Sequence, residues 1–147
     1  MYKHILIPTD GSALSRKAIA NGVKLAKSVG AKVTGFFAAP PATPLVYKDF
    51  LPVHYMTPRE HARMIEKNAA KYLSVIEQAA KQAGVRCKCI HVTSDFPADA
   101  ILAVAKRQKC DLIFMASHGR RGIAGVLLGS ETQKVLIKSK IPVLVSR

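Results

Sequence analysis

Residues 110–136 read CDLIFMASHGRRGIAGVLLGSETQKVL and join an apolar run, a glycine-rich loop and a helical pattern. The run over 110–117 has the length and composition of a buried strand. Four glycines follow it: Gly119, Gly122, Gly125 and Gly129. The letters SETQ from Ser130 have the form of a capping box, which predicts a helix with Ser130 at its N-cap. The stretch therefore indicates a strand, a glycine-rich loop and a helix in succession.

Elsewhere, short apolar runs alternate with segments of helical periodicity. The predicted strands are 3–9, 31–39, 85–93, 110–117 and 141–147, and the predicted helices are 11–30, 57–84, 97–109 and a segment from 130. Strands that alternate with helices indicate right-handed crossovers and a mostly parallel sheet with helices on both faces. We expect a single α/β domain over residues 1–147.

Local signals place several of these helices. Gly30 suits a helix C-terminus, and Thr57, Pro58 and Glu60 form a helix start with a capping box. In the helix after Thr57, small and apolar residues step by three and four: Ala62, Ile65, Ala69, Leu73, Ile76, Ala80 and Ala83. The helix at 97–109 directs Ala100, Ile101, Val104 and Ala105 inward by the same rule. The proline-rich segment 40–57 is expected to form a lid or wall beside a ligand site.

Composition limits the classes of function. The 147 residues include 23 Lys and Arg against 9 Asp and Glu, a net charge of +14, which attracts polyanions. The basic residues are scattered, so a solvated surface is favoured over a nucleic-acid face. No apolar window spans a bilayer and no signal peptide is evident, which predicts a cytoplasmic protein without membrane contact. Cys87, Cys89 and Cys110 are expected to be reduced, because neither a disulfide framework nor a zinc site has enough partners.

The ends of two predicted strands carry the residues suited to a ligand. In a doubly wound sheet, ligands bind outside the carboxyl ends of the strands where the strand order reverses. The first strand ends at residues 8–10 and the fourth at 116–119, so Asp10 and the glycine-rich loop would face one crevice. Asp10 has an alternative role as a cap of the helix that begins near Ser12.

Glycine-rich turns can direct several backbone N–H groups at an anion, and a following helix adds its positive N-terminal dipole. A phosphate chain here would meet Gly119 first and Gly129 and Ser130 last, with Arg120 and Arg121 between them. The loop is neither a P-loop, which needs G-K-[ST], nor a dinucleotide fingerprint, which follows the first strand. The glycines alone are also compatible with an ordinary surface loop.

The chain resembles single-domain bacterial universal stress proteins. The similar pieces are HILIPTDGS at 4–12, CDLIFMASHGRRG at 110–122, LLGSETQKVL at 127–136 and IPVLVSR at 141–147. This resemblance implies a five-stranded parallel sheet of order 3-2-1-4-5 and, as in many members, an ATP site with the motif G-2x-G-9x-G-[ST]. The motif falls on residues 116–119 and 129–130, with Ala116 in place of the first glycine.

The resemblance also implies a role for each site residue. The implied contacts are Pro8, Thr9 and the backbone of Ala38 at the adenine, Asp10 at the ribose or a nucleotide-bound Mg²⁺, Met115 and Ala116 at the ribose side, and Gly119, Gly129 and Ser130 at the phosphates. His118 and Arg120 would add polar contacts. No catalytic residue and no metal ligand of the chain's own are expected, because no nucleophile with a relay partner and no metal-binding spacing occur. ATP hydrolysis would be slow at most.

Three functions are compatible with these residues. The favoured one is a stress-response sensor or modulator that binds ATP, ADP or AMP, with Mg²⁺. The alternatives are a dimeric interaction module that has lost nucleotide binding through the extra methyl group of Ala116, and, less favoured, a nucleic-acid-associated basic protein. The resemblance further implies a homodimer through the last strand, with Ile141, Val143 and Val145 at the edge, and an unidentified protein partner.

Overall fold

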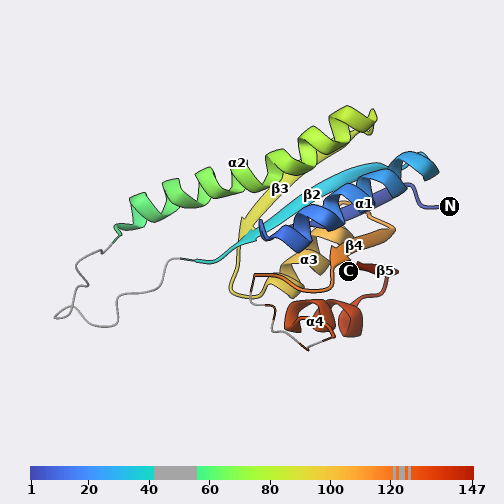
Figure 1. Ribbon diagram of the computed structural model, residues 1–147. Helices are drawn as coiled ribbons and strands as arrows, with labels where there is room; N and C mark the ends of the chain where they lie inside the picture. Colours follow the sequence, from blue (N-terminus) through green and yellow to red (C-terminus); the bar gives the residue numbers. More distant parts are fainter. Residues whose placement is uncertain (42–55, 121, 123–124, 126) are drawn as a thin grey trace.

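The computed structural model describes residues 1–41, 56–120, 122, 125 and 127–147 (Figure 1). Its strands are β1 (His4–Pro8), β2 (Lys32–Ala39), β3 (Cys87–Thr93), β4 (Leu112–Ala116) and β5 (Val143–Ser146), and its helices are α1 (Ala13–Val29), α2 (Pro58–Ala83), α3 (Pro97–Arg107) and α4 (Ser130–Lys138). The strands form one sheet in the order β3-β2-β1-β4-β5, with every neighbouring pair parallel. The predicted doubly wound α/β fold and its strand order are confirmed.

The central strand β1 is buried along its whole length because both faces of the sheet are covered. Ile5 and Ile7 belong to the apolar cluster under α1 and α2, whereas Leu6 belongs to the cluster on the opposite face with α3 and α4. Figure 1 shows these two pairs of helices on opposite sides of the sheet. This two-sided burial explains why β1 reads as a continuous apolar run rather than as an alternating one.

The chain leaves β1 in one direction to build β2 and β3, and it then returns to place β4 on the other side of β1. The carboxyl ends of β1 and β4 therefore lie next to each other at the point where the order reverses, with Ile5 and Leu6 paired to Leu112 and Ile113. A crevice beyond these two ends is the expected ligand position in such a sheet.

The predicted helix ends are mostly confirmed. Ser12 is the N-cap of α1 and accepts a hydrogen bond from Ser15 N, while Gly30 ends the helix in the left-handed region at φ 70°. The capping box of α2 is complete: the Thr57 hydroxyl accepts from Glu60 N at 3.1 Å, and Thr57 N donates to the Glu60 carboxylate at 2.8 Å.

The predicted capping box of α4 is wrong. The N-cap is Gly129, with φ −67° and ψ 155°, and no side chain caps this end, so Ser130 is the first helical residue. Gln133, the residue that would close the box, has another partner, because its Nε2 donates to Leu128 O at 3.0 Å. Glu131 Oε2 accepts a hydrogen bond from Ala98 N at the start of α3, at 2.9 Å. The N-cap of α3, Phe96, has no side-chain acceptor of its own, and Glu131 places its charge at that helix N-terminus instead.

Two further expectations on burial need correction. In α2, Ala62 is exposed and Ile65 is half-buried, because the first turns of the helix extend past the carboxyl ends of β2 and β3 (Figure 1). In α3, Ala98 is buried and Ala100 only half-buried, so the inward stripe starts two residues earlier than predicted. Most of the predicted lid, residues 42–55, lies outside the described residues. Among the described helices, none combines the length and the hydropathy needed to cross a bilayer.

Candidate functional site at the ends of β1 and β4

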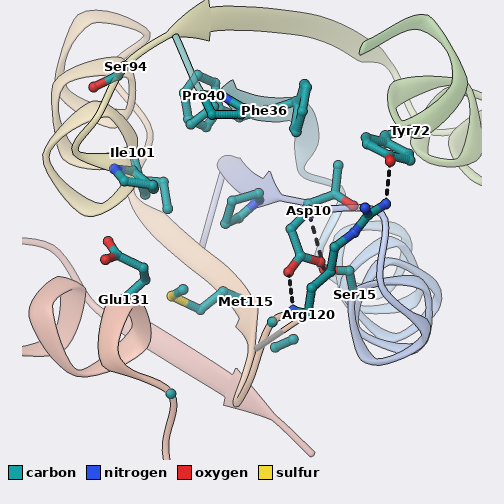
Figure 2. A pocket seen from close by; sticks show the side chains of 18 of the residues that line it. Asp10, Ser15, Phe36, Pro40, Tyr72, Ser94, Ile101, Met115, Arg120 and Glu131 are labelled. Atoms are coloured by element: carbon teal, nitrogen blue, oxygen red, sulfur yellow. Dashed lines mark hydrogen bonds between the residues drawn. The ribbon is translucent and has the colours of Figure 1, made fainter. Parts of the chain in front are cut away.

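A cavity of about 770 Å³ opens beyond the carboxyl ends of the central strands. All eleven residues of the predicted site line it: Pro8, Thr9, Asp10, Ala38, Met115, Ala116, His118, Gly119, Arg120, Gly129 and Ser130. Figure 2 shows Asp10, Tyr72 and Arg120 on one side of the cavity and Ser94, Ile101 and Glu131 on the other. The structure therefore brings the predicted residues together around one cavity.

Asp10 joins the end of β1 to the glycine-rich loop. Its Oδ1 accepts hydrogen bonds from Ser12 N at 2.9 Å and from the Ser15 hydroxyl at 2.8 Å, and its Oδ2 accepts from Arg120 N at 2.7 Å. Burial acts to raise the pKa of Asp10, but the hydrogen bonds from Ser12, Ser15 and Arg120 outweigh it and lower the pKa below the ordinary 3.8. The carboxylate thus stabilises the turn before α1 and also faces the cavity.

Glycine at residue 119 lets the Asp10 carboxylate lie directly against the backbone of the loop. A Cβ atom there would overlap Asp10 Oδ2, which occupies the space beside the backbone. The side chain missing from Gly119 is therefore what allows the carboxylate to reach Arg120 N. This gives the first glycine after β4 a steric role that is independent of any ligand.

Two backbone N–H groups of the glycine-rich loop form hydrogen bonds to nearby backbone carbonyl groups. Gly122 N donates to Gly119 O at 3.1 Å, and Gly129 N donates to Ser117 O at 2.7 Å. Gly129 therefore holds the loop against β4 through its N–H group. Within the described part of the chain, the N–H groups of Gly119 and Ser130 have no acceptor, and Ser130 opens the N-terminus of α4. These N–H groups and the helix dipole remain suited to an anion.

The side chain of Arg120 lies against α2. Its guanidinium group donates to the Tyr72 hydroxyl and sits 4.9 Å from the centre of the Tyr72 ring. Tyr72 in turn meets Phe37 edge to face, with ring centres 5.2 Å apart. The free protein thus keeps this cation on an aromatic ring at the cavity wall. Arg121, the second arginine of the loop, lies outside the described residues.

His118 lines the cavity and has one buried ring nitrogen. Its Nδ1 lies 3.1 Å from the Ser117 hydroxyl, whereas its Nε2 is buried and has no hydrogen-bond partner among the described residues. His118 therefore lines the cavity, and its polar contact with a ligand stays a prediction.

The sequence analysis did not assign several other residues of the cavity. They are Ser15, Phe36, Phe37, Asn68, Tyr72, Ser94, Asp95, Pro97, Ile101 and Glu131, whereas Pro40 and Pro41, which also line the cavity, belong to the segment 40–57 that was expected beside the site. Of these, Tyr72 had a usable signal, since it lies three residues after Ala69 and four before Ile76 on the inward stripe of α2. A tyrosine on an apolar stripe would have pointed to a half-buried ring with a polar tip at a cavity.

Replacing Asp10 with asparagine should lower the free energy of unfolding by about 1–3 kcal/mol at pH 7, because an amide nitrogen would face donors that now meet a carboxylate. Since the folded-state pKa of Asp10 is lowered, the carboxylate's contribution is present above the unfolded-state pKa and is lost as the pH falls through the folded-state value. Urea unfolding of the wild type and Asp10→Asn should therefore differ at pH 7 and converge in acid.

The matched control for this prediction is Asp99→Asn. Asp99 pairs with Lys138 at 2.9 Å, but both side chains are more than half exposed. Such surface pairs contribute about 0–1 kcal/mol, so the control should change little at any pH. Equal losses in the two variants would contradict a special role for the Asp10 carboxylate.

The comparisons with known proteins agree on one family. The model of the universal stress protein family matches residues 1–147. Universal stress protein YxiE of Bacillus subtilis is 31% identical over 151 residues that cover 100% of both chains. The solved structure of MJ0577 of Methanocaldococcus jannaschii has a TM-score of 0.78 and 28% identity, covering 99% of this chain and 95% of that one. A universal stress protein crystallised in complex with cAMP has a TM-score of 0.69 and 26% identity, covering 99% and 97%. The chain belongs to the universal stress protein family.

Proposed function

We propose that the cleft between β1 and β4 binds an adenosine nucleotide, ATP or else ADP or AMP, and that the chain acts as a nucleotide-dependent sensor or modulator in a stress response. The observation that carries the proposal is the convergence of eleven residues from separate strand ends on one cavity of about 770 Å³. Sites for small ligands are commonly concave and have volumes of about 300–1,000 Å³. The similar protein crystallised with cAMP, itself an adenosine phosphate, supports the same ligand class.

The two ends of the cavity fit the two ends of a nucleotide. Apolar groups suited to a base come from Pro8, Ala38 and Met115, with Phe36 and Ile101 beside them. Donors suited to phosphates are the N–H group of Gly119, in the loop after β4, and the N–H group of Ser130, at the start of α4. Arg120 lies at the same cavity, so its cation is within the site that the phosphates would enter.

Asp10 retains room for one ligand contact. An ionised carboxylate offers about four acceptor positions, and the chain occupies three of them through Ser12, Ser15 and Arg120. One position on Oδ2 is left for a ribose hydroxyl or for a group around nucleotide-bound Mg²⁺. The lowered pKa keeps this carboxylate ionised at neutral pH but also makes it a weak base. The proposal is therefore binding, with slow hydrolysis at most.

Adding millimolar ATP with Mg²⁺ should raise the unfolding temperature, because a ligand that binds only the folded state stabilises it. The gain in free energy would be about 2.7 kcal/mol at a ligand concentration of 100 times Kd. Differential scanning calorimetry of the wild type and of Ala116→Gly measures this. We expect both proteins to respond, and the variant to bind at least as tightly, because it restores the glycine of the family motif.

The same pair of proteins separates the alternatives. A response of Ala116→Gly without any response of the wild type would favour the alternative of an interaction module whose nucleotide binding the Ala116 methyl group blocks. No response from either protein would reject nucleotide binding by this cleft. In both cases the fold itself is monitored by the transition in the absence of ligand.

Tyr72→Phe should raise the affinity for ATP about two- to tenfold, because the variant removes the hydroxyl that competes with phosphate for the Arg120 guanidinium. The ring beside the guanidinium is retained, so the packing of α2 is little changed. Isothermal titration with ATP and with adenosine distinguishes the two ends of the ligand. The adenosine affinity should stay constant, and a weaker ATP affinity in the variant would show that Tyr72 itself assists binding.

We also propose that two copies of the chain pair through β5, which is an edge strand of the sheet. Pro142 O and Ser146 O accept bonds from β4, and main-chain groups alternate along a strand, so those of Val143 and Val145 point to the open edge. Ile141 and Val143 are partly buried against the core, while Leu144 is 39% exposed and Ile137 on α4 is 82% exposed.

Leu144→Glu should convert the proposed dimer to a monomer, because it places two like charges near one symmetric interface. Size-exclusion chromatography with light scattering gives the mass of each species. The control is Met64→Glu, since Met64 is similarly exposed (38%) but lies on α2, on the opposite face of the sheet from α4. A wild-type protein that elutes with the mass of one chain would refute the pairing.

A further inference from the structure

Cys87 and Cys89 form a thiol pair at the edge of the sheet, away from the nucleotide cleft. They alternate with Lys88 on β3, so both side chains project from the same face of the strand. Their sulfur atoms are 4.0 Å apart, and both residues are half-buried. The strand is an outer strand of the sheet, with β2 on one side only.

The neighbouring residues leave space for this pair. Gly35 on β2 is paired with Cys89, and a Cβ atom at residue 35 would lie 2.7 Å from the Cys89 sulfur. The absence of a side chain at Gly35 is therefore what accommodates that sulfur under α2. The Cys89 sulfur also lies 3.8 Å from Leu73 O on α2, which fixes its position from the helix side.

A disulfide does not fit the spacing of the pair. Residues two apart in a strand are separated by about 6.6 Å along its axis, whereas the Cβ atoms of a disulfide lie about 3.5–4.5 Å apart. Closing the bond would require the regular ladder between β2 and β3 to bend. Seven consecutive residues of β3, from Cys87 to Thr93, are in register with β2, so the ladder opposes that distortion.

A shared metal ion requires a smaller movement of the sulfur atoms than a disulfide, in which they lie about 2.05 Å apart. Two thiolates bound to one metal at about 2.3 Å have their sulfur atoms about 3.8 Å apart at a tetrahedral angle and about 4.6 Å apart when collinear with the metal. The observed 4.0 Å is about 0.6 Å shorter than the collinear spacing that suits an ion with two ligands. Within the described part of the chain there is no group of three or more His, Cys, Asp or Glu side chains that could hold a metal ion. An ion bound here would therefore have to be one that is stable with two sulfur ligands.

We propose that the Cys87–Cys89 pair binds one Cu(I) ion. Cu(I) is a soft cation that selects thiolate ligands, and it is stable with two of them, whereas zinc sites take four ligands or three with water. Binding forms two copper–sulfur bonds and releases the two S–H protons to solvent. The copper enters and stays as Cu(I), so no electron is transferred and no oxidant is required.

The copper site is independent of the proposed nucleotide site. Cys87 and Cys89 pair with Val33 and Gly35 in the first half of β3, whereas the cleft is lined by Ser94 and Asp95 beyond its end. A chain that failed to bind ATP would therefore still bind Cu(I), and a chain that failed to bind Cu(I) would still bind ATP. The two proposals can therefore be tested independently of each other.

The test is an anaerobic titration of the reduced, full-length protein against the Cu(I)–bicinchoninate complex. The loss of its absorbance gives stoichiometry and affinity. We expect the wild type to withdraw one Cu(I) per chain, and Cys87→Ser and Cys89→Ser each to lose at least tenfold in affinity. Cys110→Ser is the matched control, because Cys110 is buried in the opposite apolar cluster and should leave the affinity unchanged.

Three results would overturn the proposal. They are a wild type that withdraws no copper from the competitor, single Ser variants of the pair that bind as the wild type does, and displacement of the copper by a tenfold excess of Zn²⁺. Thermal unfolding of each variant establishes that it is folded. Cys87→Ala and Cys89→Ala replace any serine variant that is not, since alanine leaves no buried hydroxyl group without a partner.

Discussion

The site depends on one carboxylate that receives three hydrogen bonds from two separate parts of the chain. Asp10 binds Ser12 and Ser15 at the start of α1 and Arg120 in the loop after β4. A half-buried carboxylate would ordinarily be costly, but three donors stabilise its charged form and lower its pKa. Deeper in the sheet, the same two strands pair through Ile5 and Leu6 with Leu112 and Ile113.

Two glycines leave space for the side chains that pack at the ends of these strands. A Cβ atom on Gly119 would occupy the position of Asp10 Oδ2, and one on Gly11 would enter the Tyr72 ring. Gly11 also has φ 80°, a conformation that other residues adopt at a cost. The two glycines therefore let a carboxylate and an aromatic ring pack directly on backbone. This explains in steric terms why the ends of β1, β4 and the middle of α2 meet at one cavity.

Most of the fold could be predicted from local pattern, because buried strands and capped helices have signals within a few residues. Thr57, Pro58 and Glu60 illustrate this, since every atom of that capping box comes from one turn. Ser130 illustrates the failure: the letters SETQ match a capping box, but Gly129 is the N-cap and the Gln133 side chain donates to Leu128 O instead. The residues of the cleft were found through the motif and the strand ends, whereas Tyr72 and Ser94 reach it only through the packing of α2 and β3.

The prior contact between Asp10 and Arg120 affects how a ligand would change the molecule. Because the strand ends are already joined, a nucleotide would enter a cleft whose backbone is in place, and little binding free energy would be lost to rearrangement. The Arg120 side chain is the exception, since its guanidinium group is held by Tyr72 on α2. A polyphosphate that drew this cation away would release one contact between α2 and the loop while leaving the sheet unchanged. Ligand binding in the cleft would thereby change the contacts of α2, because the two states of Arg120 differ in their contacts with that helix.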